Sequence, residues 1–149
     1  HAICLPPGRF GGDDIDQFFS NQLDWDKDPC YREIRGLKVS AHLFIRRTGE
    51  LVQYVSLHDR AWHAGQSSLQ GRENCNDYSI GIELEGTDCS EFEPAQYDTL
   101  IRVSEAIMDC FPKITLERIV GHSDIAPGRK TDPGSGFDWA LFKKRLKNK

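Results

Sequence analysis

Residues 79–84, Ser-Ile-Gly-Ile-Glu-Leu, alternate in the manner of a β-strand whose two faces meet different surroundings. The three apolar residues share one face, whereas Gly81, Glu83 and the following Glu85 share the other. A carboxylate in the middle of such a strand is paired, or solvated in a cleft or on an open sheet face, or buried with a raised pKa that suits a general base. The pattern leaves these three alternatives open for Glu83.

The segments on both sides of this strand add a hairpin and helices. Upstream, the apolar runs 39–47 and 51–56 are separated by Thr48-Gly49-Glu50, which is the pattern of a β-hairpin. Downstream, residues 94–111 carry apolar side chains at helical spacing, and Pro94 suits a first turn. We also expect helices at 13–23 and 137–146, a short strand at 118–121, and loops at 5–12 and 61–77. The mixture predicts an α+β (mixed α/β) fold, with a central mixed β-sheet flanked by helices.

Length and composition point to one ordinary globular domain. The 149 residues fit a single domain over 1–149, with 38% hydrophobic and 28% charged residues. The net charge of -4 argues against a general nucleic-acid binder, which must neutralise phosphates with Lys and Arg. No apolar run approaches the roughly 20 residues that a membrane-spanning helix needs. We expect a monomer with no nucleic-acid partner and no membrane span.

The N-terminus and the cysteines bear on the compartment. The chain opens on His1-Ala2-Ile3-Cys4 without a Met, so we interpret the N-terminus as truncated or processed. The cysteines are odd in number, irregularly spaced and without a CxxC pair: Cys4, Cys30, Cys75, Cys89 and Cys110. This pattern favours reduced thiols in a cytoplasmic protein over a disulfide framework. A cleaved signal upstream of His1 would leave a periplasmic location open.

The most informative segment for chemistry is 121–134, Gly-His-Ser-Asp-Ile-Ala-Pro-Gly-Arg-Lys-Thr-Asp-Pro-Gly. It places His122 at the end of the predicted strand, and the Pro/Gly loop after it can turn Asp132 back towards this histidine. Zinc accepts imidazole nitrogen and carboxylate oxygen, and a catalytic zinc site uses three protein ligands plus water. Spacing alone does not choose a third ligand. The alternative is a hydrogen-bonded structural histidine beside a solvated Lys-x-Asp pair.

Three other positions have competing interpretations. Trp62 lies between small residues in the 61–77 loop, where it either forms a ligand-stacking wall or caps the core. His42 lies inside an apolar run, which favours a hydrogen-bonded core histidine. We expect His58 to be exposed.

Five separated motifs together resemble the AmpD family, the 1,6-anhydro-N-acetylmuramyl-L-alanine amidases of bacterial cell-wall recycling. They are His-x-Ile-x-Leu-Pro-Pro-Gly at 1–8, Val-Ser-Ala-His at 39–42, Ala-Trp-His-Ala-Gly at 61–65, Ser-Ile-Gly-Ile-Glu-Leu-Glu-Gly at 79–86 and Gly-His-x-Asp-Ile-Ala-Pro-x-Arg-Lys-Thr-Asp-Pro-Gly at 121–134. The motifs occur in the family's order and cover nearly the whole chain. The resemblance implies the zinc-amidase fold, which peptidoglycan recognition proteins share.

The resemblance also implies site residues. One catalytic Zn²⁺ would be held by His1, His122 and Asp132, with the fourth position open for water. Glu83 would orient that water and carry its proton, and Lys130 would stabilise the oxyanion beside the zinc.

The implied substrate is an anhydro-muropeptide, cut between the lactyl group of its N-acetylmuramic acid and L-alanine. Trp62, His63, Ala64 and Lys38 would bind it. Lys38 stands where the family often has Arg, so a bidentate clamp on a peptide carboxylate becomes a point charge. Ala2 stands where the family commonly has Asn, and the family carries an apolar strand before its first ligand that this sequence lacks.

Two other readings compete with the amidase. One is a non-catalytic muropeptide-binding module of the same fold. Non-cutting relatives typically lose a zinc ligand, whereas this chain keeps all three candidates together with Glu83 and Lys130, which favours the enzyme. A structural zinc protein would need four closed ligands, and only Cys4 lies near the ligand segments.

Overall fold

The computed structural model describes residues 1–147, whose centre is a four-stranded mixed sheet in the order β1-β6-β2-β3. The strands are β1 (Ala2–Ile3), β6 (Ile82–Glu85), β2 (Leu43–Ile45) and β3 (Leu51–Gln53). β1 and β2 run parallel to β6, and β3 is antiparallel to β2. The predicted mixed sheet is therefore confirmed. The last two residues of the predicted domain, 148–149, lie outside the described part.

Strand β6 is flanked by a strand on each side and is almost fully buried, as expected for a strand with parallel neighbours. It begins at Ile82 rather than at Ser79. The Gly81 carbonyl accepts the amide N–H groups of both His42 and Leu43, at 3.1 and 3.2 Å, which interrupts the regular ladder just before Ile82.

The hairpin of β2 and β3 forms where the sequence predicts it, with shorter strands. Its turn is closed by Arg46 N–H to the Glu50 carbonyl at 2.9 Å and Gly49 N–H to the Arg46 carbonyl at 2.8 Å. Gly49 has φ of 85°, and a β-carbon there would meet the Ala95 carbonyl oxygen at 2.8 Å. A glycine is therefore required at this position.

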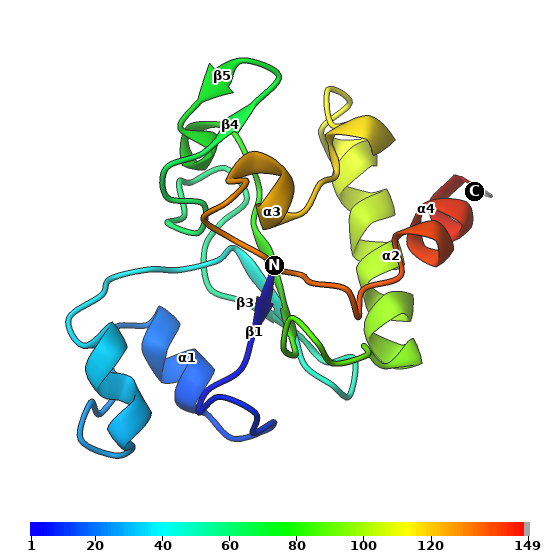
Figure 1. Ribbon diagram of the computed structural model, residues 1–149. Helices are drawn as coiled ribbons and strands as arrows, with labels where there is room; N and C mark the ends of the chain where they lie inside the picture. The colour runs from blue at the N-terminus through cyan, green and yellow to red at the C-terminus, as the bar shows by residue number, and fades with distance from the viewer. Residues whose placement is uncertain (148–149) are drawn as a thin grey trace.

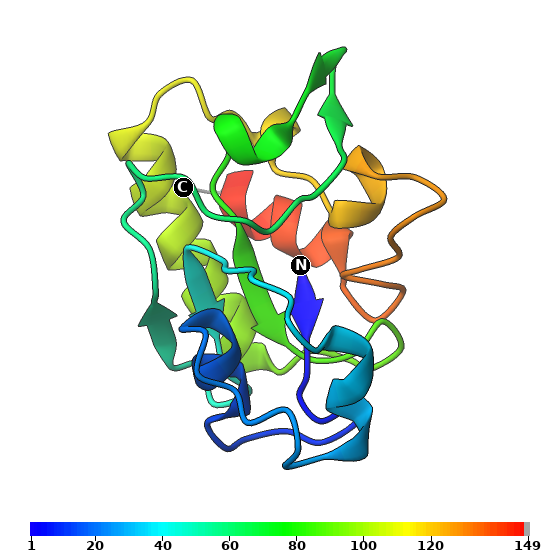
Figure 2. The same ribbon diagram turned by 90° about the vertical axis from the view of Figure 1, so that its left-hand side faces the viewer.

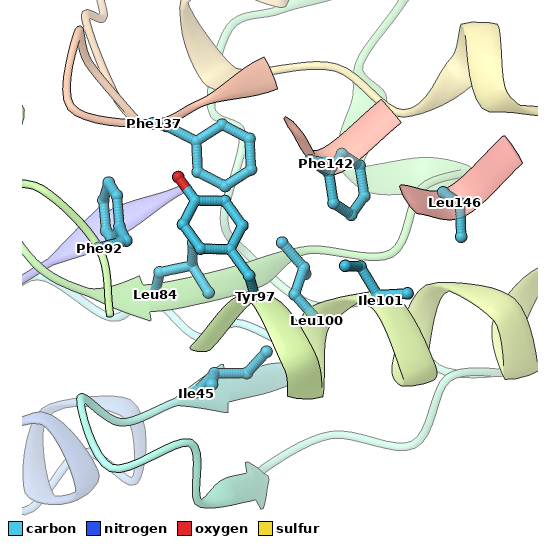
Figure 3. Close-up of a cluster of buried hydrophobic side chains, with 9 residues drawn as sticks. All are labelled: Ile45, Leu84, Phe92, Tyr97, Leu100, Ile101, Phe137, Phe142 and Leu146. Carbon is cyan, nitrogen blue, oxygen red and sulfur yellow. The ribbon is translucent and has the colours of Figure 1, made fainter. Parts of the chain in front are cut away.

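Helices α2 (Pro94–Cys110) and α4 (Trp139–Lys147) cover one face of the sheet (Figures 1 and 2). α2 starts with a capping box between Glu93 and Gln96. The Gln96 amide also donates to the carbonyls of Ile45 and Glu85, so it ties the helix to two strands. Figure 3 shows the apolar core between these elements: Ile45, Leu84, Phe92, Tyr97, Leu100, Ile101, Phe137, Phe142 and Leu146.

The opposite face of the sheet is covered by α1 (Asp14–Phe19) and the 3-10 helix η1 (Pro29–Ile34), as Figure 1 shows. Phe44 and Ile45 are consecutive in β2 and pack into different clusters, because side chains alternate across a strand. The second core comprises Leu5, Ile15, Phe18, Phe19, Leu23, Tyr31, Ala41 and Phe44. Two apolar layers thus hold the sheet between them.

The expected strand at 118–121 is wrong. The chain makes a 3-10 turn, η3 (Leu116–Arg118), and within the described part residues 118–121 form no strand. His122 therefore does not follow a strand but begins the short helix α3 (His122–Ile125). The Asp124 carboxylate accepts the Gly121 N–H at 2.7 Å, which caps this helix locally.

The expected loop at 61–77 contains regular structure that its composition did not predict. It holds the hairpin of β4 (Ser68–Leu69) and β5 (Arg72–Glu73), then the 3-10 helix η2 (Cys75–Asp77). Gln70 and Gly71 both have positive φ, which suits a two-residue hairpin turn. Helix α1 is shorter than the expected 13–23, α2 ends one residue before the expected end, and α4 begins two residues after the expected start. Among the described residues no helix has the length and apolarity to span a bilayer.

Candidate functional site

Three side chains from distant parts of the sequence converge beside the sheet. The Nδ1 atoms of His1 and His122 lie 3.0 Å apart. One Asp132 carboxylate oxygen lies 3.2 Å from the His1 Nδ1, and the other lies 3.2 Å from the His122 Nδ1. Tetrahedral zinc at about 2.0–2.1 Å from each ligand would space ligand atoms about 3.3 Å apart. The two nitrogens and the carboxylate therefore fit a zinc ion in chemistry and spacing.

Each of the three is placed by its backbone. His1 is held against β6, because its backbone nitrogen donates to the Ile82 carbonyl and its carbonyl accepts the Leu84 N–H, both at 3.0 Å. His122 is the first residue of α3, and Asp132 closes the loop that follows, its carbonyl accepting the Ser123 N–H at 3.0 Å. In Figure 1 the N-terminus accordingly lies beside α3 and this loop.

The charge state of Asp132 suits a metal ligand. Burial alone would raise the pKa of its carboxyl group, yet hydrogen bonds to the His1 and His122 rings hold that pKa well below its ordinary value. The carboxylate is therefore ionised at neutral pH and attracts a cation between the two rings.

Glu83 lies next to this cluster, with its Oε1 4.0 Å from the His1 Nδ1. The side chain is buried, and its Oε2 has no hydrogen-bond partner among residues 1–147. Burial raises the pKa of Glu83 to about 7. Of the three alternatives for this residue, the structure agrees with the buried carboxyl group, whose raised pKa suits proton transfer near neutral pH.

Lys130 lies on the loop between α3 and Asp132, with an exposed side chain. Its backbone N–H donates to the Ala126 carbonyl at 3.0 Å, which fixes the loop. Burial lowers the pKa of His1, but Glu83 and Asp132 raise it overall, and burial raises the pKa of Glu83; the Lys130 charge opposes both rises as a smaller effect. The ammonium group therefore lies within electrostatic reach of the cluster.

Trp62 is 55% exposed, so it does not cap the core. The Arg60 guanidinium lies over its indole ring, 3.8 Å from the ring centroid. Lys38 is also exposed, and the segment that follows it runs beside Trp62, because the Ser40 N–H donates to the Trp62 carbonyl at 3.1 Å. Both side chains are therefore accessible on adjoining segments, and Trp62 directly precedes His63 in the chain.

His63 and Ala64 lie behind the ligands. The His63 Nδ1 is 3.0 Å from the His1 Nε2, and the buried Ala64 presents its carbonyl to the His122 Nε2 at 2.9 Å. Burial and the nearby His1 lower the pKa of His63 to about 3, so it is neutral. These contacts connect both residues to the ligands, while their assignment to substrate binding stays a prediction.

Two residues that the sequence did not single out hold this segment in place. The Asn76 Oδ1 accepts the N–H groups of His63 and Ala64 at 3.0 and 2.8 Å. The Arg129 guanidinium donates to the carbonyls of Ala64 and Gln66 at 2.6 and 2.7 Å. Neither residue belongs to a periodic pattern, so only the tertiary structure identifies its contacts.

The other two histidines match their predictions. His42 is fully buried, with its Nε2 2.9 Å from the Asp59 carbonyl and its Nδ1 accepting the Gly81 N–H at 3.0 Å. Burial lowers the pKa of His42, as expected for a neutral core histidine. His58 is exposed.

The five cysteines, all within the described part, are free thiols.

A cavity of about 430 Å³ lies beside the His1 and His122 rings, on the α2 face of the sheet. Ile82 and Leu84 of β6 line it, whereas Glu83 points to the opposite face of the strand. The Glu83 carboxyl group therefore lies on the strand face away from this cavity.

Comparison with known proteins agrees with the family resemblance seen in the sequence. Residues 13–135 match the N-acetylmuramoyl-L-alanine amidase family. The chain is 57% identical to the 1,6-anhydro-N-acetylmuramyl-L-alanine amidase AmpD of Escherichia coli (strain K12), over 96% of this chain and 78% of that protein. It is 52% identical to the AmpD of Haemophilus influenzae, over 99% of this chain and 80% of that one.

Solved structures agree with these relatives. A crystal structure of a selenomethionine derivative of AmpD superposes with a TM-score of 0.94, at 54% identity, over 97% of this chain and 80% of that chain. The E. coli amidase AmiD, in complex with anhydro-N-acetylmuramic acid-L-Ala-D-γ-Glu-L-Lys, superposes with a TM-score of 0.68, at 34% identity, over 80% of this chain and 52% of that chain. The shared fold thus extends over nearly the whole of this chain.

Proposed function

This chain belongs to the N-acetylmuramoyl-L-alanine amidase family, and from that premise we propose that it is a zinc-dependent 1,6-anhydro-N-acetylmuramyl-L-alanine amidase. It hydrolyses the amide bond between the lactyl group of anhydro-N-acetylmuramic acid and L-alanine in muropeptides, a reaction of cell-wall recycling. The observation that carries the proposal is the convergence of His1, His122 and Asp132, with the carboxyl group of Glu83 next to them.

His1, His122 and Asp132 are the proposed zinc ligands, which gives the ion two imidazoles and one carboxylate. Three protein ligands would leave a fourth position of a bound zinc ion open, as catalytic rather than structural zinc sites do. When bound, zinc supplies Lewis-acid chemistry, which polarises a carbonyl group and acidifies water.

Glu83 is the proposed general base and then general acid. As water attacks the lactyl carbonyl carbon, the Glu83 carboxylate accepts a proton from that water. As the C–N bond breaks, the protonated carboxyl group gives the proton to the departing amine of L-alanine. The buried Oε2 without a partner and the pKa raised to about 7 support this double role.

Lys130 is the proposed oxyanion partner. The carbonyl oxygen of the substrate becomes negatively charged in the tetrahedral intermediate, and a positioned ammonium group stabilises that charge. The exposed side chain leaves Lys130 free to turn towards a bound substrate, and its charge already acts on Glu83 and His1.

The exposed Trp62 and Lys38 are the proposed contacts with the rest of the muropeptide. Trp62 offers an aromatic face for the sugar, and Lys38 offers a point charge for a carboxylate of the peptide stem. The five free thiols support a reducing compartment, so a cytoplasmic location stays our prediction.

A turnover assay on an anhydro-muropeptide tests the proposal, with the released peptide and anhydro-sugar measured by mass spectrometry. We expect product from zinc-loaded protein, loss of product after chelation, and recovery when zinc is restored. If zinc-replete protein binds the muropeptide but never cleaves it, the non-catalytic binding module replaces the enzyme.

A further inference from the structure

A chain of hydrogen bonds runs from the first proposed ligand into the interior. The His1 Nε2 lies 3.0 Å from the His63 Nδ1, and the His63 Nε2 lies 3.3 Å from the Ser79 hydroxyl. That hydroxyl donates to the Cys75 carbonyl at 2.5 Å. The chain ends there, at a group that cannot pass a proton on.

The end of the chain sets the direction of every bond in it. A carbonyl oxygen only accepts, so the Ser79 proton goes to Cys75, and the Ser79 oxygen is left to accept from the His63 Nε2–H. The His63 Nδ1 then presents a lone pair, which accepts the Nε2–H of His1. The reverse direction would set two lone pairs against each other between His63 and Ser79.

The second proposed histidine ligand, His122, is oriented by Ala64, the residue that follows His63. The Ala64 carbonyl can only accept, so the His122 Nε2 carries a hydrogen and donates to it at 2.9 Å. Residues 63 and 64 are consecutive, and each accepts the Nε2–H of one ligand ring. The His63 Nδ1 accepts from His1, and the Ala64 carbonyl accepts from His122. Asn76 fixes the two together, because its Oδ1 accepts both of their backbone N–H groups.

We propose that His63 is a positioning residue for the metal, which holds His1 with its Nε2 protonated and its Nδ1 lone pair turned towards His122 and Asp132. Ser79 in turn fixes the orientation of His63. This inference deepens the proposed function and rests on its ligand set. A partner that orients a metal-bound histidine typically contributes about 10–100-fold to metal affinity.

A pair of variants of similar size separates the hydrogen bond from packing. His63→Asn keeps an acceptor near the place of the ring Nδ1, whereas His63→Leu removes it and fills a comparable volume. We expect His63→Leu to bind zinc about 10–100-fold more weakly in competition with a chelator, and His63→Asn to stay much closer to the unchanged protein. Equal losses in the two variants, or no loss in His63→Leu, would overturn the proposal.

Nitrogen NMR of zinc-loaded protein with ¹⁵N-labelled histidine provides the second readout. We expect the His1 ring to show a metal-bound Nδ1 and a protonated, exchange-protected Nε2, with the protection reduced in Ser79→Ala. A His1 ring bound through Nε2 overturns the proposal even if every His63 variant fails to fold. Neither zinc affinity nor NMR depends on turnover. The positioning role of His63 can therefore be disproved in a protein that has amidase activity, and it can be supported in a protein that has none.

Discussion

Gly81 lies directly against the imidazole ring of His63, so a β-carbon at position 81 would overlap the ring Cγ. Position 81 therefore requires a glycine, because the strand backbone and the His63 ring approach each other closely there. We predict that Gly81→Ala displaces His63 from His1, lowers zinc affinity about 10–100-fold, and costs about 1–3 kcal/mol of unfolding free energy. Zinc content after dialysis and urea unfolding would measure the two effects.

Gly86→Ala is the matched control for this prediction. A β-carbon on Gly86 would overlap the Phe92 ring, in the core between the sheet and α2, away from the metal ligands. We expect Gly86→Ala to lose stability but to keep its zinc affinity. If both variants lose zinc to the same degree, the contact between Gly81 and His63 has no specific role.

Glu83→Gln tests the proton transfer. The amide has nearly the same shape as the carboxyl group but cannot accept a proton at neutral pH. We expect kcat to fall about 10²–10⁴-fold while zinc content stays unchanged. The control is Glu85→Gln on the same strand, whose carboxylate accepts the N–H groups of Gly11 and Arg47 and should affect stability rather than turnover. Near-normal turnover of zinc-loaded Glu83→Gln would exclude it as the base.

Much of the fold could be predicted because its signals are local. Thr48-Gly49-Glu50 between two apolar runs predicted the hairpin, and the spacing of apolar residues after Pro94 predicted α2 to within one residue of its end. The strand expected at 118–121 failed for the opposite reason. A short apolar run has no periodicity of its own, and within the described part residues 116–118 form the 3-10 turn η3 while 119–121 belong to no strand.

The site was harder to predict than the fold. His1 and Asp132 are separated by 131 positions, and no spacing rule connects them. The ligand set came from the resemblance to a family, and the structure brings the same three side chains together. The roles of Asn76 and Arg129 are unpredictable from sequence, because each acts on backbone groups that only the folded loop brings near.

Lys130→Ala tests the oxyanion partner. We expect this variant to keep its zinc, because Lys130 is not among the three converging ligands, and to lose about 10²–10³-fold in kcat with a much smaller change in KM. The control Lys143→Ala removes a charge from α4, where the ammonium lies over the Trp139 ring. Turnover of Lys130→Ala equal to that of Lys143→Ala would remove Lys130 from the mechanism.

Asp132→Ala tests the ligand set directly. Without this carboxylate only the two imidazoles of the proposed ligand set remain, so we expect zinc content to fall well below one ion per chain. Elemental analysis after equilibration with a weak chelator would measure it. An unchanged zinc content in a folded Asp132→Ala protein would contradict the assignment of Asp132 as a ligand.

The contacts of the buried Asp14 carboxylate predict that it stabilises the fold at neutral pH and that this stabilisation is lost in acid. These contacts do not involve the proposed metal ligands. Burial alone would raise the pKa of this carboxyl group, but the Lys27 ammonium and the Tyr31 hydroxyl, donating at 2.6 Å, lower it overall, against a smaller opposing effect of Asp28. Because the folded pKa lies below the unfolded value of about 3.9, the contribution is present above that pH and is lost as the pH falls through the folded pKa. Asp14→Asn should therefore lower the unfolding free energy at pH 7 by about 1.5–3 kcal/mol, and the difference in unfolding free energy from the unchanged protein should narrow below about pH 4.

Urea unfolding between pH 7 and 3 measures this difference for Asp14→Asn, with Asp13→Asn at the more exposed neighbouring carboxylate as the control. A difference that stays constant over that range would show that Asp14 does not stabilise the fold through its charge.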